Sequence, residues 1–170
     1  MPEPTPGRWL LDPAASSVTF THKNLWGLIT VKGVFTDVSG EGALAADGTA
    51  SGVLTVGTDS VDTKHGKRDK HLRSADFFYI EEHPTLTFTV RSATRGANDT
   101  VEVAGDLAVR GTTRPLTFTA RATELSADAV TLAGQLDVDR AWFGMNWNQL
   151  GMLRGLATIT LNTRFNRQSG

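Results

Sequence analysis

Most of this chain alternates apolar and polar residues with a period of two, the pattern of half-buried β-strands. Within Thr85–Ser92, for example, Leu86, Phe88 and Val90 fall on one face, and threonines and an arginine on the other. Turn signals such as Asp47-Gly48 separate successive runs. We therefore expect eight to ten strands, drawn from the runs 9–12, 17–23, 28–38, 41–46, 52–60, 85–92, 101–109, 115–123, 129–139 and 156–165.

The number and spacing of these strands narrow the fold to two all-β architectures. Eight to ten antiparallel strands with one apolar face each fit a closed barrel or a two-sheet sandwich. Local turns between consecutive strands favour an up-and-down meander, and so a barrel. In the 28–38 run, Phe35 and Val38 have opposite parities, which predicts a bend or bulge near Gly33. We expect one domain over residues 1–170, with loose tails at about 1–7 and 167–170.

One stretch, from Lys64 to Phe78, breaks the alternation and is crowded with charged residues. Its composition predicts a short helix over Lys67–Leu72, because few of its residues are β-branched. Arg68 and Leu72 would share one face of this helix, with Asp69 on the next stripe. A single charged helix in an all-β chain is expected to cover something that the strands leave open.

Composition and charge exclude several classes of protein. The 170 residues suit one domain that buries about two-thirds of its unfolded surface, and a net charge of −1 attracts neither nucleic acid nor anionic membrane. The absence of cysteine excludes disulfides, thiolate catalysis and Cys-ligated zinc. No run of 18 apolar residues occurs, so we expect no membrane span. The Pro-rich start lacks the features of a secretory signal, which predicts a cytoplasmic location if the chain is as synthesised.

Signals for catalysis or a metal are weak. The histidines His22, His65, His71 and His83 match no zinc spacing, and no nucleophile elbow or phosphate-binding loop occurs. We therefore expect no metal, no cofactor and no catalytic residue. A carboxylate pair could still be drawn from Asp59, Asp62, Asp69, Asp76, Glu81 and Glu82, although solvated surface carboxylates are commoner. The basic residues around the helix lack the interleaved aromatic residues of single-strand binders, so no nucleic-acid partner is expected.

The apolar parity of the strands predicts one shared interior. Seven residues should line it: Phe20, Leu54, Val56, Phe88, Leu107, Phe118 and Leu136. A barrel of about eight strands is packed solid or holds one small ligand. The small residues predicted on inward faces leave both outcomes open, because they either underfill the barrel or mark bulges and turns; they are Gly33, Gly105, Gly134, Ala43, Ala120 and Ala122.

A second irregular segment, from Arg140 to Arg154, carries Trp142, Phe143, Met145 and Trp147. So many large apolar side chains are unusual in a solvated loop. We expect them near the mouth of the interior, where Trp142 and Phe143 would contact a ligand, or in a contact between two copies of a homodimer.

Several motifs, in order along nearly the whole chain, carry a resemblance to a known family. They are Lys67-Arg68-Asp69-Lys70-His71-Leu72-Arg73-Ser74 with Asp76-Phe77-Phe78, an opening Trp9 and Asp12, Gly33-Val34-Phe35, His83-Pro84, Gly105-Asp106-Leu107, and Arg140 with Phe143-Gly144. In these motifs the chain resembles the YceI-like family of lipid-binding, lipocalin-like proteins, whose members are often periplasmic.

The resemblance implies an eight-stranded antiparallel barrel with a helix packed over it. It also implies binding, sequestration or transport of a polyisoprenoid or similar amphiphilic lipid inside the barrel, without catalysis. Inward-facing His22 and the helix residues Arg68, Asp69 and His71 are candidates for contacting the lipid head. A lid would then use Leu72, Phe77 and Phe78 as apolar attachment, while Arg68 and Asp69, expected to pair directly, and Arg140 would form a structural network. The alternative is an isomerase or hydrolase of a lipid-like substrate in the same cavity.

Overall fold

The computed structural model describes residues 3–24, 29–74, 78–139 and 156–168. Strands dominate it, with one α-helix and two short 3-10 turns. In chain order the elements are β1 Gly7–Leu11, η1 Pro13–Ala15, β2 Ser17–Asn24, β3 Ile29–Phe35, β4 Val38–Leu44, β5 Ala50–Gly57, η3 Thr58–Ser60, β6 Val61–Asp62, α1 Gly66–Arg73, β7 Thr85–Arg95, β8 Thr100–Val109, β9 Thr112–Leu125, β10 Ala129–Asp139 and β11 Leu156–Arg167.

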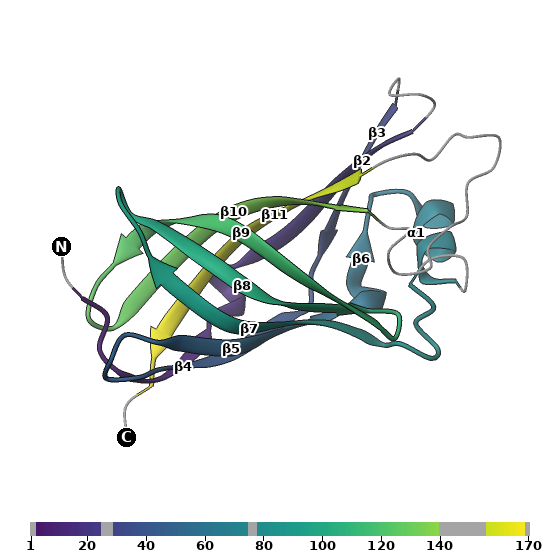
Figure 1. Ribbon diagram of the computed structural model, residues 1–170. Coiled ribbons are helices and arrows are strands. Elements are labelled where there is room, and N and C mark those ends of the chain that lie inside the picture. Colours follow the sequence, from purple (N-terminus) through teal and green to yellow (C-terminus); the bar gives the residue numbers. More distant parts are fainter. Residues whose placement is uncertain (1–2, 25–28, 75–77, 140–155, 169–170) are drawn as a thin grey trace.

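The strands close into an antiparallel barrel of eight strands (Figure 1). Their order is β1-β4-β5-β7-β8-β9-β10-β11, and the ring closes because β11 pairs with β1 as well as with β10. Closure removes the exposed edges that an open sheet would present. The predicted all-β barrel with one short helix is therefore confirmed, and the sandwich is not adopted.

The remaining strands, β2, β3 and β6, are the continuations of three barrel strands beyond a bend. In chain order β2 follows β1, β3 precedes β4, and β6 follows β5. The first part of β11 pairs with β2, whereas its last residues pair with β1. The single strand expected over residues 28–38 is wrong, since β3 ends at Phe35 and β4 starts at Val38. The Ser60 hydroxyl holds this bend by accepting hydrogen bonds from the backbone N–H groups of Thr36 and Asp37, both at 3.1 Å.

The bend expected near Gly33 is also wrong, because Gly33 pairs in regular register with Phe20. Its lack of a side chain has another cause. A Cβ at this position would overlap the ring of Phe20 and lie 2.9 Å from the methyl group of Thr63. Gly33 is thus required by close packing rather than by the backbone path.

The two ends of the barrel differ in how the strands pair. At the closed end, which carries the hairpins 44–50 and 95–100, neighbouring strands pair all the way round. At the helix end, formed by α1, β6 and the turn 109–112, β9 and β10 pair only from Ala120 to Leu125 of β9, and β6 pairs with β3 alone. The barrel therefore divides here into two leaves, β10-β11-β2-β3-β6 and β7-β8-β9, which diverge toward α1 (Figure 1).

Pro115 lies in the half of β9 that has no β10 partner. Proline cannot donate a ladder hydrogen bond, so within sheets it is confined to edges and strand ends. Its presence as the fourth residue of a 14-residue strand is explained by the separation of the two leaves.

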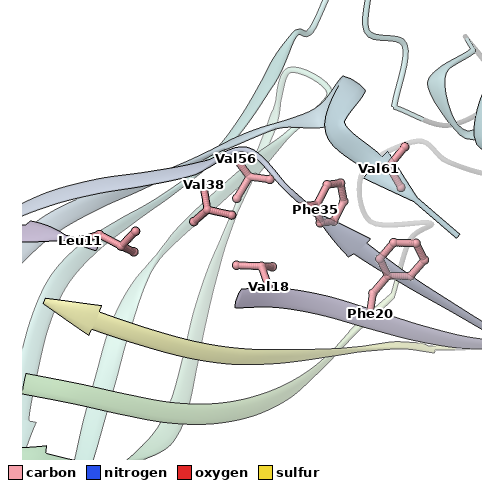
Figure 2. Close-up of a cluster of buried hydrophobic side chains, with 7 residues drawn as sticks. All are labelled: Leu11, Val18, Phe20, Phe35, Val38, Val56 and Val61. Atoms are coloured by element: carbon pink, nitrogen blue, oxygen red, sulfur yellow. The ribbon is translucent and has the colours of Figure 1, made fainter. Parts of the chain in front are cut away.

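The core consists of three overlapping apolar clusters inside the barrel. Figure 2 shows the first, in which side chains from six strands face one interior: Leu11, Val18, Phe20, Phe35, Val38, Val56 and Val61. Leu54 packs against this cluster and against the one around Phe88, while Leu107 joins the latter to the cluster of Val109 and Val138. All seven residues assigned to one interior from their parity belong to these connected clusters. Ala43, expected to face inward, is instead exposed.

Candidate functional site

Apolar surface remains accessible on the inner face of the barrel toward the helix end. Leu86, Leu107, Leu116, Leu136 and Ile159 all pack against core clusters, yet each is only half-buried. Farther from the helix, four inward residues of β8 and β9 are buried, namely Val101, Val103, Ala120 and Ala122, whereas Leu125 at the end of β9 is again half-buried. On these two strands the accessible residues nearer α1 are Leu107 and Leu116, while Val109, at the helix end of β8, is itself buried.

The inward glycines do not create this accessible surface, because phenylalanine rings cover them. A Cβ on Gly105 would lie 2.7 Å from the ring of Phe88, and one on Gly134 would lie 3.1 Å from the ring of Phe118. Gly33 is covered by Phe20 in the same way. The sequence left two explanations open for the inward glycines: they underfill the barrel, or they mark bulges and turns. Neither explanation fits Gly33 or Gly134, because a neighbouring ring fills the space beside each glycine and each lies in regular register.

Helix α1 follows β6 directly and spans Gly66–Arg73, two residues longer than the expected 67–72. It starts at His65, whose Nδ1 accepts a hydrogen bond of 3.2 Å from the backbone N–H of Arg68. This side-chain acceptor satisfies one of the N–H groups that a helix leaves unpaired in its first turn. It ends at Ser74, in agreement with the exit expected there.

The side chains of α1 take the place of the strand that β6 lacks on its outer side. Arg73 donates to the carbonyl oxygens of Asp59 and Val61, at 3.0 Å each, and Arg68 donates to that of Thr63 at 2.8 Å. Asp69 Oδ1 accepts from the backbone N–H of Thr63 at 2.9 Å. Because unpaired backbone groups are costly away from water, these bonds compensate for the absence of a ladder with β7.

Thr63 connects the two charged residues at the start of the helix. Its hydroxyl accepts from Arg68 Nε at 2.8 Å and donates to Asp69 Oδ1 at 2.5 Å. Asp69 is only 7% exposed and Thr63 only 5%. The direct bidentate pair expected between Arg68 and Asp69 is thus replaced by a relay through a buried hydroxyl. Such burial of a carboxylate requires hydrogen-bond donors, and Thr63 supplies two.

The segment after the helix reaches the other leaf. The guanidinium of Arg110, in the β8–β9 turn, lies 5.9 Å from the centre of the Tyr79 ring, within range of a cation–π contact. Leu72 and Phe78 pack against the clusters of both leaves, including the one formed by Val109 and Val138. Helix α1 and this segment therefore bridge the two leaves through side chains.

The other predicted residues fall into three groups. Phe77, Arg140, Trp142 and Phe143 lie outside the described residues, as does the side chain of His22, a β2 residue whose backbone pairs with Val31 of β3. His71 is half-buried in the last turn of α1. The remaining carboxylates form no catalytic pair among the described residues: Asp62 pairs with Lys64, while Asp59, Glu81 and Glu82 are exposed and Asp76 is not described.

Thr63 and Arg73 were not predicted from the sequence to be members of the network. The alternation of inward and outward residues could also have identified Leu86, Leu116 and Ile159. They lie on the same inward faces as the residues that were predicted to line the interior. In the described part of the chain, no group of three or more His, Asp or Glu residues could hold a metal ion. The one α-helix described there is neither long nor apolar enough to cross a membrane.

Comparisons with known proteins agree with this architecture. The model of the YceI-like domain matches residues 9–165. A UPF0312 protein of Ectopseudomonas mendocina is 42% identical over 91 residues, which cover 52% of this chain and 48% of the relative. Protein YceI of Escherichia coli O157:H7 is 46% identical over 68 residues, covering 40% and 35%. The matched part thus spans about half of the first relative and about a third of the second.

Solved structures show the same fold. BcnA of Burkholderia cenocepacia superposes with a TM-score of 0.81 at 18% identity, covering 91% of this chain and 98% of that one. A polyisoprenoid binding domain from Saccharophagus degradans superposes with a TM-score of 0.76, also at 18% identity, covering 94% and 98%.

Proposed function

Because the chain belongs to the YceI-like family, we propose that its barrel binds an amphiphilic lipid of the polyisoprenoid type and sequesters or transports it without catalysis. The observation that carries this proposal is the half-buried apolar lining toward the helix end, formed by Leu86, Leu107, Leu116, Leu136 and Ile159. The similar domain from Saccharophagus degradans, which is named for polyisoprenoid binding, gives further support.

The chemistry of the lining suits a tail rather than a polar substrate. Removing apolar surface from water gains about 25 cal/mol per Å², and the surface of an isoprenoid tail is almost entirely apolar. Pockets of this kind bury most of a ligand and fix its head with a few polar groups. In this proposal the tail lies along the inner leucines, with Phe20, Leu54, Val56, Phe88 and Phe118 as further contacts. Its head points to the helix end, near His71 and His22.

Helix α1 serves as the lid in this proposal. Leu72 and Phe78 occupy the space between the two leaves, and their contacts with both leaves involve only side chains. The Arg68–Thr63–Asp69 relay fixes the helix to β6. Parting the leaves at this end breaks no β9–β10 ladder, since none exists there.

An isomerase or hydrolase on the same barrel would need an acid or base with a perturbed pKa inside the cavity. The described carboxylates whose pKa is lowered, Asp47, Asp62 and Glu124, owe this to neighbouring hydrogen bonds at the protein surface. No observation among the described residues favours the enzyme. The cytoplasmic location and the homodimer stay predictions.

Native mass spectrometry of the purified protein, followed by organic extraction, tests the proposal. We expect a co-purified lipid or, after its removal, binding of farnesol in a one-to-one complex. Leu116→Trp should fill the lining and abolish binding, whereas Thr117→Trp, on the exposed face of the same strand, should leave it unchanged. Failure of the folded protein to bind any isoprenol, or equal binding by both variants, would contradict the proposal.

A further inference from the structure

Two aromatic rings meet inside the barrel about midway along β7 and β9. The ring centroids of Phe88 and Phe118 are 5.8 Å apart, with a tilt of 51° between the ring planes. Their strands are separated by β8, so the pair spans the inner face of one leaf. Phe88 is buried, whereas Phe118 is half-buried. Of the two rings, Phe118 is therefore the one with more surface open to a ligand.

The position of the Phe118 ring depends on Gly134 of the next strand. The nearest atoms to a Cβ built on Gly134 are two ring carbons of Phe118, at 3.1 and 3.4 Å, followed by the Cβ of Ala120 at 3.7 Å. No backbone atom is among them. The ring thus lies back against β10 in the space that a side chain would otherwise occupy, and a larger residue here would displace the ring rather than the backbone.

Phe118 also stands where the packing of β9 changes. Toward the closed end the next inward residues are Ala120 and Ala122, which are 3% and 9% exposed. Toward the helix end the next inward residue is Leu116, which is half-buried and packs with Leu107 in the accessible lining. Phe118 is therefore the first inward residue of β9 on the helix side of the buried Ala120 and Ala122 that remains accessible, and the half-buried Leu125 lies beyond these alanines at the other end of the strand.

We infer that Phe118, seated on Gly134, determines tail-length specificity: it ends the ligand-accessible part of the barrel and limits how long an isoprenoid tail can be fully buried. This inference rests on the proposed function. A tail that reaches Phe118 gains from every buried methylene, whereas a longer tail must fold back or leave its end outside the barrel. The class of ligand is thus an amphiphile whose tail matches the distance from α1 to Phe118.

Dissociation constants for geraniol, farnesol and geranylgeraniol, measured by calorimetry on the delipidated protein, test this. Phe118→Ala should shift the preference toward the longest alcohol by about tenfold, because burying roughly two more methylenes suffices for that change. Gly134→Ala, which pushes the ring toward the lumen, should shift it toward the shortest alcohol. Thr119→Ala, on the exposed face of β9, is the matched control and should leave the order unchanged.

The possible outcomes separate the inference from the proposed function. If the wild-type protein binds none of the alcohols, the proposed function fails. If it binds them and neither Phe118→Ala nor Gly134→Ala changes their order relative to Thr119→Ala, the tail-length inference is overturned while the function stands. Should Phe118→Ala fail to fold, Gly134→Ala decides alone, because it removes no atoms from the core.

Discussion

The two ends of the barrel solve the same problem, the pairing of backbone groups, by different means. At the closed end each strand pairs with both neighbours through backbone ladders, which are irregular only at Val90–Ser92 and Thr131–Leu132 among the described pairings. At the helix end β9 and β10 are not paired and β6 has no neighbour beyond β3, so the guanidinium and carboxylate groups of α1 bond the backbone of Val61 and Thr63 at and beside this free edge.

The two ends also differ in how strictly they constrain the amino-acid sequence. A backbone ladder accepts many side chains, so the closed end is constrained mainly by inward and outward parity. Where side chains replace a strand, their identities matter. The planar guanidinium of Arg73 holds two donors in a fixed fork that binds two carbonyl oxygens, and the carboxylate of Asp69 supplies the acceptor that the N–H of Thr63 needs. The helix end is also where the inner apolar surface is accessible, so one region combines specific polar fixation with the proposed ligand site.

Removing Asp69 should have the largest effect. Asp69→Ala leaves the buried N–H and hydroxyl of Thr63 without their acceptor, which should lower the free energy of unfolding by about 3 kcal/mol. The melting temperature should fall by roughly 6–12 °C. Lipid release should be faster, because the helix is held less firmly. Calorimetry and a lipid-retention assay on one preparation measure both quantities.

Ser126→Ala is the control for this variant. Ser126 bonds the backbone of Ala129 in the β9–β10 turn at the closed end, so its loss should cost less and leave lipid release unchanged. Asp69→Asn keeps one acceptor, so its loss of stability should lie between those of Asp69→Ala and Ser126→Ala. If Asp69→Ala alters neither stability nor retention, side chains do not hold the helix end as described.

A smaller effect is expected for Arg73→Lys, which keeps the charge but loses the fork that binds two carbonyl groups. The free energy of unfolding should drop by about 1 kcal/mol, since one of the two hydrogen bonds is lost. Chemical denaturation with an unchanged slope would measure it. Lys70→Ala, on the exposed face of α1, should have no comparable effect, and equal losses in the two variants would show that the carbonyl contacts are unimportant.

The smallest effect concerns an outer-surface network on β9, β10 and β11. Hydrogen bonds from Arg164 and Thr131 hold the pKa of the Glu124 carboxyl below its usual value. A lowered pKa in the folded state stabilises the protein above the ordinary carboxyl pKa of about 4.3, and this contribution is lost as the pH falls below it. Glu124→Gln should therefore flatten the acid limb of a melting-temperature profile. A limb of unchanged slope would count against this network.

Period-two patterning predicted an all-β fold, because inward and outward residues alternate along stretches such as Leu86–Val90 of β7 and Val101–Val109 of β8. The pattern fitted a barrel or a sandwich, and the local turns between strands favoured the barrel. The helix was predictable from its break in that pattern. Pro115 also carried a usable signal that was not exploited: a proline within a strand indicates an edge, and the edge here is the separation of β9 from β10.

Other features were beyond local patterns. The bend at Thr36–Asp37 depends on the hydroxyl of Ser60, 24 residues away from Thr36. The roles of Gly33 and Gly134 depend on rings from neighbouring strands. Thr63 became part of the charged network only because β6 lacks a partner on its outer side. In each case the determining contact is between residues distant in sequence or follows from the topology. The two-residue periodicity of strands encodes neither.

Hydrogen exchange measured by mass spectrometry, with and without bound farnesol, tests the central claim most directly. In the free protein, α1, β6 and the segments 112–119 and 135–139, which pair on one side only, should exchange faster than the segments 120–125 and 130–134, where β9 and β10 pair with each other. Farnesol should slow exchange in the first group and leave the closed end unchanged. If binding instead protects the closed-end hairpins, or protects the whole barrel evenly, the ligand site is not at the helix end.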